Sequence, residues 1–380
     1  MARPSLWNYE YTAYWKETNP WVFVTPTHFS KQTQVDLGYQ AAYQDIEEID
    51  NSFFQWKLIK DKVTTWGSFS GYANSEDTGH ALSMALWTPT TSTVTAWVYS
   101  HVYNLWDKAC STYTVEVSKG GYVERVSWVS LDTLTIANDN AAIKLDWSAK
   151  GQYCFSSAIL SANVTAWTWV TFTVDSTLGL LTWDVLISKA DSEEITITVV
   201  DWTTFTANLV WNKTAWDVFN LKKKTASFTA WLETLKWYGK AEIKFANTLG
   251  WLSSATPTPI TSISTEIQNN IVENHGSSSY HSYDNTQGLR KGSGKISLTM
   301  AKWTDLQLKY LKDEYQYVSF KTEWNKIGST AHYETLTFVA KIKFTSSPVS
   351  ISSWEIIVLN MDFKIVDEGS FTLKNAVASY

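Results

Sequence analysis

The stretch that decides the fold is Leu336-Thr-Phe-Val-Ala-Lys-Ile-Lys-Phe344, in which apolar residues occupy every second position. A period of two places successive side chains on opposite faces of a β-strand. Similar alternating or β-branched runs recur along the chain, at Thr112–Val117, Leu134–Ile136, Ala142–Asp146, Ile195–Val199, Ile296–Met300 and Ile356–Ile365. The sequence therefore predicts a mainly β protein.

Two short segments have a helical pattern instead. The first runs from Asp77 to Leu86, with Ser and Asp available as caps and Pro89 beyond its end. The second runs from Thr304 to about Glu314, and its apolar side chains share one helical face, at Leu308, Leu311 and Tyr315. We expect strands almost everywhere else.

These helices belong to an internal repeat. Gly67-Ser-Phe-Ser-Gly71 precedes the first helix, and Gly294-Lys-Ile-Ser-Leu298 precedes the second at nearly the same distance. The strand-rich tract after each helix ends in a similar unit, Ala142–Gly151 and Val358–Gly369. The pattern predicts two tandem copies of one β-sandwich or barrel module, each with one short helix. A chance likeness between two β-rich tracts is the alternative.

The chain is expected to divide into five segments. Residues 163–222 are read as an inserted domain, because five short strands between tight turns are typical of a small β-barrel. The tract Ser253-Ser-Ala-Thr-Pro-Thr-Pro259 has the composition of a linker. The predicted order is an extended N-terminal arm (1–34), module copy 1 (35–162), the inserted domain (163–222), a linker and connecting strand (223–257) and module copy 2 (258–380).

The overall composition excludes several classes of protein. The 380 residues include 31 basic and 37 acidic side chains, a formal net charge of −6 that argues against tight sequence-specific DNA binding. No apolar run approaches the ~18 residues of a transmembrane helix, and the start of the chain lacks the apolar region of a secretory signal. Cys110 and Cys154 lack metal-ligand spacing, so we expect buried free thiols in a reducing compartment.

One feature of the composition is unusual. Tryptophan occurs 22 times and glycine only 16 times, about 4% of the chain against an average near 7%. Asp201-Trp202 joins two predicted strands where a two-residue hairpin favours Asp-Gly, since a type I′ turn needs positive φ at both central residues. Similar turn-like contexts surround further tryptophans, at Trp21, Trp147, Trp167, Trp169, Trp183, Trp211, Trp216 and Trp324.

Two explanations of the tryptophans are open. Some bacteria and their phages read the UGA codon as glycine, so these tryptophans can be UGA codons translated in the wrong code. Restoring glycine would make each suspect turn conventional. The alternative is a genuine tryptophan-rich surface, such as a carbohydrate-binding protein with exposed stacking platforms.

No residues are predicted to be catalytic, to bind a cofactor or to hold a metal, and we expect no enzyme activity. His275 and His281 could form a metal or general-base loop, but their spacing matches no metal motif and favours a polar hairpin tip. Adjacent carboxylates in a strand point to opposite faces, so Glu47-Glu48 and Glu193-Glu194 cannot act as acid–base pairs. Residues 288–294 are glycine-rich but lack the context of a phosphate loop.

With tryptophan read as glycine, recurrent strand and turn patterns run through most of the chain, at Tyr11–Phe29, Thr112–Tyr122, Glu124–Ile136, Ser264–Gly276 and Gly292–Thr299. In these patterns the sequence resembles the tail tube proteins of long-tailed, siphovirus-like bacteriophages. None of the matching residues is a catalytic signature.

The resemblance implies a structural virion protein, assembled in the host cytoplasm, whose stacked rings form a hollow conduit for DNA ejection. Two modules per chain would suit a trimeric ring with pseudo-sixfold character, whereas a single module would imply a true hexamer. Its partners would be further copies, paired by strand addition through flanking loops and the N-terminal arm, and other tail proteins, with no membrane. DNA would pass without specific binding, which mild acidity suits. The alternative is a virion fibre, decoration or adhesin protein that binds glycans through exposed tryptophans.

Overall fold

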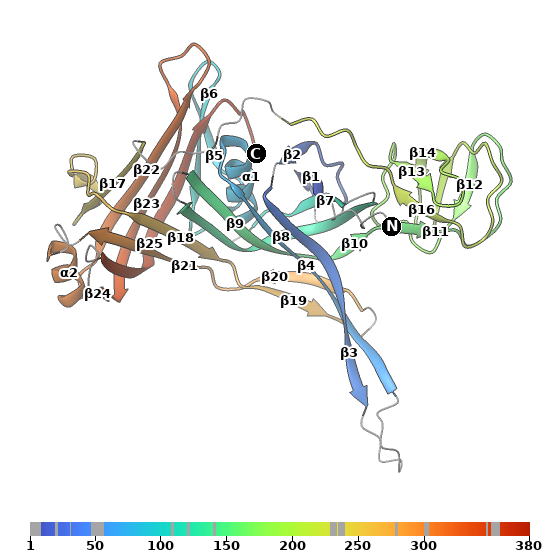
Figure 1. Ribbon diagram of the computed structural model, residues 1–380, viewed down its shortest axis with the longest axis horizontal. Coiled ribbons are helices and arrows are strands. Elements are labelled where there is room, and N and C mark those ends of the chain that lie inside the picture. Colours follow the sequence, from blue (N-terminus) through green and yellow to red (C-terminus); the bar gives the residue numbers. More distant parts are fainter. Residues whose placement is uncertain are drawn as a thin grey trace, which may run out of the picture.

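The fold is mainly β, as predicted, with large antiparallel sheets and two α-helices (Figure 1). It was obtained as a computed structural model. The described residues are 9–19, 22–30, 32–46, 57–107, 110–119, 122–139, 142–228, 234, 240–277, 280–299, 304–346, 349–350 and 358–380. The expected contexts at Trp21 and Glu47-Glu48 lie outside them.

A long sheet of eight antiparallel strands runs through the molecule. Four strands lie on each side of its middle, where β8 pairs with β18. In spatial order the strands are β3 (Gln34–Ile46), β4 (Lys57–Tyr72), β9 (Ala142–Gly151), β8 (Tyr122–Asp139), β18 (Ser262–Gln268), β21 (Lys291–Thr299), β25 (Val358–Asn375) and β23 (Tyr333–Ser346). The short strand β24 (Val349–Ser350) continues β23 along β25.

Two further sheets form because long strands bend out of the long sheet. The first half of β8 pairs with β7 (Tyr113–Lys119) and β10 (Tyr153–Phe155), and β7 continues to β1 (Tyr9–Lys16) and β2 (His28–Ser30). Residues 333–342 of β23 pair with β22 (Gln316–Lys326), which pairs with β17 (Ala241–Ala246). Residues 370–375 of β25 pair with β6 (Val98–Asn104), which pairs with β5 (Thr90–Thr95). Each half of the chain is therefore a β-sandwich.

The strand pairings repeat between the two halves, which we call module 1 and module 2. Module 1 follows the order β1-β7-β8-β9-β4-β3, and module 2 follows β17-β22-β23-β25-β21-β18, with every pair antiparallel. A helix precedes β7 or β22 in each, α1 (Ser75–Leu86) and α2 (Thr304–Leu311). The prediction of two tandem sandwich modules, each with one helix, is confirmed.

The register of the repeat differs from the expectation in one detail. Asp146 lies opposite Ser70 in module 1, and Asp362 lies opposite Lys295 in module 2. When these two aspartates are superposed as equivalents, Gly67 corresponds to Gly292 and not to Gly294. The sequence likeness of the two glycine-containing segments is too short to fix the register, whereas the ladder pairs fix it residue by residue.

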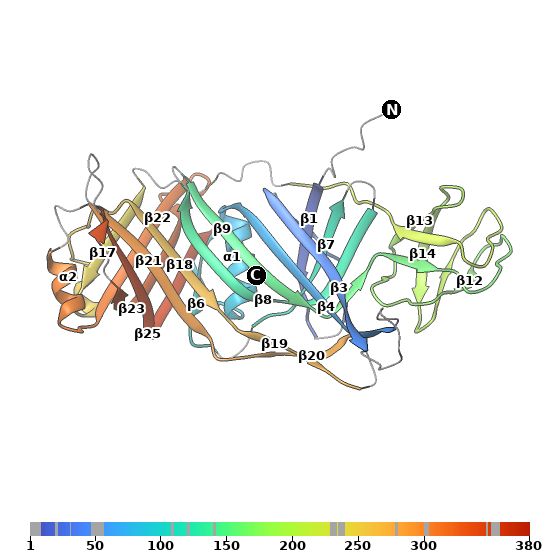
Figure 2. The ribbon, with the colours of Figure 1, turned by 60° about the horizontal axis from the view of Figure 1, so that its bottom comes forward.

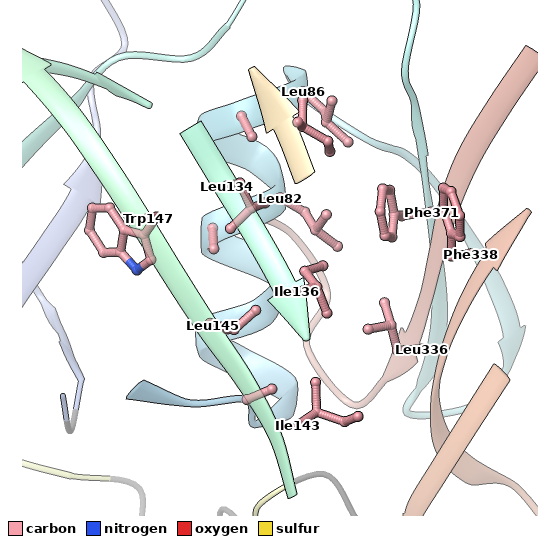
Figure 3. Close-up of a cluster of buried hydrophobic side chains, with 14 of the residues drawn as sticks. Leu82, Leu86, Leu134, Ile136, Ile143, Leu145, Trp147, Leu336, Phe338 and Phe371 are labelled. Carbon is pink, nitrogen blue, oxygen red and sulfur yellow. The ribbon is translucent and has the colours of Figure 1, made fainter. Parts of the chain in front are cut away.

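The core lies between the sheets and includes both modules (Figure 3). The side chain of Asn74 accepts a hydrogen bond from the Asp77 amide and so caps α1, in place of the expected Ser or Asp. Leu82 and Leu86 of α1 pack in one cluster with Leu134 and Ile136 of β8. The same cluster includes Phe338 and Phe371 of module 2, so the two modules share one hydrophobic core.

The inserted domain is a small closed barrel at one end of the molecule (Figure 2). Its six strands are β11 (Ser157–Ile159), β16 (Val218–Leu221), β13 (Val185–Ser188), β14 (Glu194–Val200), β15 (Thr204–Ala207) and β12 (Val170–Thr173), in spatial order. A bridge between Leu160 and Val174 joins the first and last strands. The stacked rings of Phe172 and Phe205, 4.6 Å apart, fill its core. The barrel has one strand more than expected, because β11 precedes residue 163.

Two long hairpins extend from the same side of the molecule. One is β3–β4, and the other consists of β19 (Ile271–His275) and β20 (Ser282–Gln287), which inserts between β18 and β21 (Figure 1). The amide of Val63 donates to the carbonyl of Tyr280, so the hairpins touch. The remaining regular element of the described residues is the 3₁₀ turn η1 (Leu249–Trp251). None of the helices in the described ranges is long and apolar enough to cross a membrane.

Candidate assembly interface

The long sheet ends in two open edges. At one end, β3 pairs only with β4 among the strands of the described residues. At the other end, β23 and β24 pair with β25, while the opposite side of residues 343–346 and 349–350 faces no described strand. Open edges present unpaired backbone donors and acceptors, which a further strand can satisfy. The chain thus carries an acceptor edge at each end of one sheet.

The junction between the modules shows how such edges fit together. Residues 133–137 of β8 pair antiparallel with residues 264–268 of β18. In this junction Thr135 lies opposite Glu266. β8 corresponds to β23, and β18 corresponds to β3, so the covalent chain already contains one copy of the contact that the open edges could make.

The ladder pairs transfer this register to the open edges. Thr135 lies opposite Asp146, whose module 2 equivalent Asp362 lies opposite Ser346. On the other side of the junction, Glu266 lies opposite Ser293, and its module 1 equivalent is Asp36, which lies opposite Ser68. The contact equivalent to Thr135–Glu266 would therefore bring Ser346 of one copy opposite Asp36 of the next.

One face of the long sheet is largely polar, although the exposed rings of Trp66 and Tyr72 also lie on it, opposite Lys150 and Lys144. Along β9, Ile143, Leu145, Trp147 and Ala149 are buried, and the alternate side chains are partly exposed. The polar side is dominated by serine, threonine and paired charges: Thr133 with Ser148 at 2.7 Å, Ser297 with Asn360 at 2.7 Å, Lys144 with Asp146 at 3.3 Å and Lys295 with Asp362 at 3.8 Å. Lys144 and Lys295 on this face lie beside carboxylates, which reduces the positive charge available to bind phosphate.

A buried ion network fastens the inserted barrel to module 1. Arg125 of β8 is fully buried and donates two hydrogen bonds to Asp184 of the barrel, at 2.6 and 2.9 Å. It also donates to Glu116 of β7 from Nε and Nη2. Burial alone would raise the pKa of Glu116, but the charges of Arg125 and Lys224 hold it below its ordinary value. The network gives the barrel a fixed attachment, which sequence reasoning missed because its residues are far apart in the chain.

A second buried polar cluster surrounds α1. The hydroxyl of Tyr14 donates to Asp77 Oδ1 at 2.6 Å, and His28 Nε2 lies 2.9 Å from the same oxygen. Burial alone would raise the pKa of Asp77, but hydrogen bonds from His28, Tyr14 and Asn74 hold it below its ordinary value. Burial lowers the pKa of His80 well below its usual range. The cluster therefore ties β1 and β2 to α1.

The N-terminal segment is thus part of the sandwich. The sequence predicts an extended arm over residues 1–34, and the described part is extended, but β1 pairs with β7 along its length. Its residues Tyr11, Thr12, Ala13 and Tyr14 are all buried. The backbone pairing holds β1 within its own chain, and the Tyr14 side chain packs in the hydrophobic core.

The remaining sequence-predicted positions fall as follows. His275 and His281 flank the turn of the β19–β20 hairpin, which agrees with the expected hairpin tip. Glu193 pairs with Lys213, and Glu194 pairs with Lys222, so these carboxylates serve separate ion pairs. Burial raises the pKa of Cys110 to about 11 and that of Cys154 to about 12, and both are free thiols. Within the described ranges, no three His, Cys, Asp or Glu residues are placed to hold a metal ion.

The tryptophans fall into two groups. Twelve of those in the described ranges are exposed, and three are buried, namely Trp128, Trp147 and Trp324. The expected turns at Trp147 and Trp324 are wrong, because both residues lie within strands with their rings in the core. The expected hairpin at Asp201-Trp202 joins β14 to β15, but neither residue has positive φ, so the turn is not type I′.

A cavity of about 680 Å³ lies between β17, the segment 251–258 and α2. The charged residues of its lining are Lys309 and Lys312. Because no carboxylate is among the described lining residues, these residues do not contain an acid–base pair.

No protein family model matches the chain, and no curated protein matches it.

Proposed function

We propose that this chain is a structural subunit that assembles head to tail into closed rings, and that stacked rings form a hollow tube of the phage tail type. The observation that carries the proposal is the β8–β18 junction, which joins two equivalent modules within one sheet. The same junction can be repeated between β23–β24 of one copy and β3 of the next. Head-to-tail contacts of this kind form rings when the rotation closes.

The proposal fits the chemistry of the polar face. In a closed ring, the core and α1 lie on one side of the long sheet, so its polar face would line the channel. Serine, threonine and matched charges would let a polyanion such as DNA pass without specific binding. Three chains with two modules each would give a ring with pseudo-sixfold character. The subunit would then belong to a virion tail.

A cysteine pair tests the ring. In a background with Cys110 and Cys154 changed to alanine, Asp36→Cys and Ser346→Cys place two thiols at the proposed contact between copies. Directly opposed residues of an antiparallel pair are about 4.5–5.5 Å apart between Cα atoms, which a disulfide can span. Oxidation should give a ladder on a non-reducing gel that ends at three chains, and electron microscopy should show rings or tubes.

The matched control lies inside the chain. Thr135→Cys with Glu266→Cys reproduces the same contact at the internal junction. This pair should close within one chain and give no ladder. If the internal pair closes while the Asp36–Ser346 pair leaves only single chains at every concentration, and no rings are seen, the proposal is wrong.

A second candidate function is glycan binding by the inserted barrel. It is favoured by one observation, that all six tryptophans of the barrel are exposed, Trp202 at 91%. Aromatic faces exposed in this way can stack on sugar rings. In this case, the chain would be retained on a polysaccharide column as a monomer, and Trp202→Ala with Trp211→Ala would abolish the retention. Rings without retention would support the tube.

A further inference from the structure

We infer that Trp87, Trp97, Trp169, Trp183 and Trp216 occupy positions at which the naturally made chain has glycine, and that Trp147 and Trp324 are genuine tryptophans. The inference sorts the tryptophans by backbone conformation and burial. It does not depend on the proposed tube. Its chemical basis is that UGA specifies tryptophan in one genetic code and glycine in another, whereas UGG specifies tryptophan in both.

The backbone carries the first part of the argument. These five tryptophans have φ between 60° and 82°, a region that L-residues with a Cβ rarely enter. The other non-glycine residues with positive φ in the described ranges, Trp128 apart, are Ser192, Asn270, Asp313 and Asp367, which have small polar side chains. Asn and Asp tolerate this conformation best after glycine. A large aromatic residue has no such reason to be there.

The local elements show what glycine would do at each position. Trp87 follows the last residue of α1 with φ 82° and ψ −176°, a combination adopted essentially by glycine alone. Glycine is also the residue that most often ends helices in a positive-φ conformation. Trp97 is the second residue of the two-residue turn between β5 and β6, with φ 66°. Positive φ at this position of a turn favours glycine.

The burial of the side chains separates the same two groups of tryptophans. The five rings are 44–80% exposed, so they contribute little packing that would offset backbone strain. Trp147, by contrast, lies in the middle of β9 at 4% exposure, and its ring stacks on Phe69 with centroids 3.8 Å apart. Trp324 is 5% exposed within β22. Neither has positive φ. These two rings fill space that glycine would leave empty.

At Trp128 the backbone conformation and the burial of the ring favour different residues, so this position is not assigned. It has φ 50° at a bulge of β8, where Ser127 and Trp128 face one residue of β7, but its ring is buried. Glycine is favoured at such a bulge, while burial favours the ring. The five assigned positions satisfy both criteria in the same direction, so the test is built on them.

Paired substitutions in the full chain test the inference. At each of the five positions, glycine should raise the midpoint of thermal unfolding by about 2 °C because it relieves strain, and the five together by about 10 °C. Alanine at the same positions removes the exposed ring but keeps a Cβ, so it should not reproduce the rise. Trp147→Gly or Trp324→Gly should lower the midpoint by several degrees, since each opens a cavity.

The genetic record gives a second, independent readout. UGA codons are expected at the five positions and UGG codons at Trp147 and Trp324, and peptide masses of the natural protein should show glycine at the five. The inference is overturned by UGG codons at the five positions, by peptide masses showing tryptophan there, or by alanine raising the thermal midpoint as much as glycine.

Discussion

Module 1 and module 2 share one strand order but differ in how their helices are covered. Eleven of the twelve residues of α1 are buried, and Tyr380 from the end of module 2 donates a hydrogen bond to the Ser75 carbonyl beside it. Leu308 and Leu311 of α2 are instead 49% and 68% exposed. The difference teaches that module 1 is completed by module 2 of its own chain, whereas nothing in the described part of the chain covers α2 in the same way.

The modules also differ in buried charge. Module 1 contains the Arg125 network, because it anchors the inserted barrel. The charged pairs of module 2 lie near the surface, such as Lys295 with Asp362, which are 78% and 45% exposed. Burial therefore separates strong from weak ion pairs within one chain, and this contrast can be tested from both sides.

The largest effect is expected from Arg125→Ala. The change leaves Glu116 and Asp184 buried without their common partner, so the free energy of unfolding should fall by about 3–5 kcal/mol. Urea unfolding followed by circular dichroism measures the loss. Arg125→Lys keeps a positive charge but not the paired hydrogen bonds to Asp184. Its free energy of unfolding should therefore lie between those of the unchanged chain and Arg125→Ala. A loss below about 1 kcal/mol for the alanine variant would contradict the assigned role.

Sequence reasoning predicted the fold better than the contacts. Alternation along Leu336–Phe344 and the two helical segments were enough for the strands, helices and repeat, because each of these depends on local pattern. The contact of Arg125 with Asp184 joins residues 59 positions apart, and no spacing rule marks it. The turn contexts at Trp147 and Trp324 failed since local composition alone cannot distinguish a turn from a strand whose ring enters the core.

The open edges illustrate the same limit. The resemblance to tail tube proteins implied strand addition between copies, but the proposed register comes only from the β8–β18 ladder within the chain. The register between Ser346 and Asp36 depends on a β-bulge in β23, near residues 344–346. A bulge shifts the pairing by one residue and leaves little trace in a sequence.

An intermediate effect is expected from pH, acting on module 1. Burial lowers the pKa of His80, so below about pH 6.5 the unfolded chain binds a proton that the folded chain does not. The free energy of unfolding should therefore decrease as the pH is lowered below about 6.5, by up to about 1.4 kcal/mol per pH unit from this group. Asp77 and Glu116 have lowered pKa values, so their contribution is lost only below about pH 4.

Urea unfolding between pH 7.5 and pH 5 measures this slope, and His80→Phe is the matched control. Phenylalanine keeps an aromatic ring beside Tyr14 and Tyr380 but cannot titrate. Its profile should be flatter over this range. An unchanged slope in His80→Phe would assign the acid sensitivity to other groups and would remove this difference between α1 and α2.

The smallest effect is expected from Lys295→Ala on the polar face. Its ammonium lies 3.8 Å from Asp362 Oδ1, but water screens both groups, so the free energy of unfolding should change by less than about 0.5 kcal/mol. Any change should shrink further in about 0.5 M salt, where the screening length is only a few ångströms. A loss comparable to that of Arg125→Ala would mean that exposure does not separate the two pairs. Both substitutions remove a cation that is paired with a carboxylate in the same chain. A small loss of stability for Lys295→Ala and a large one for Arg125→Ala would therefore attribute the difference to burial and hydrogen bonding.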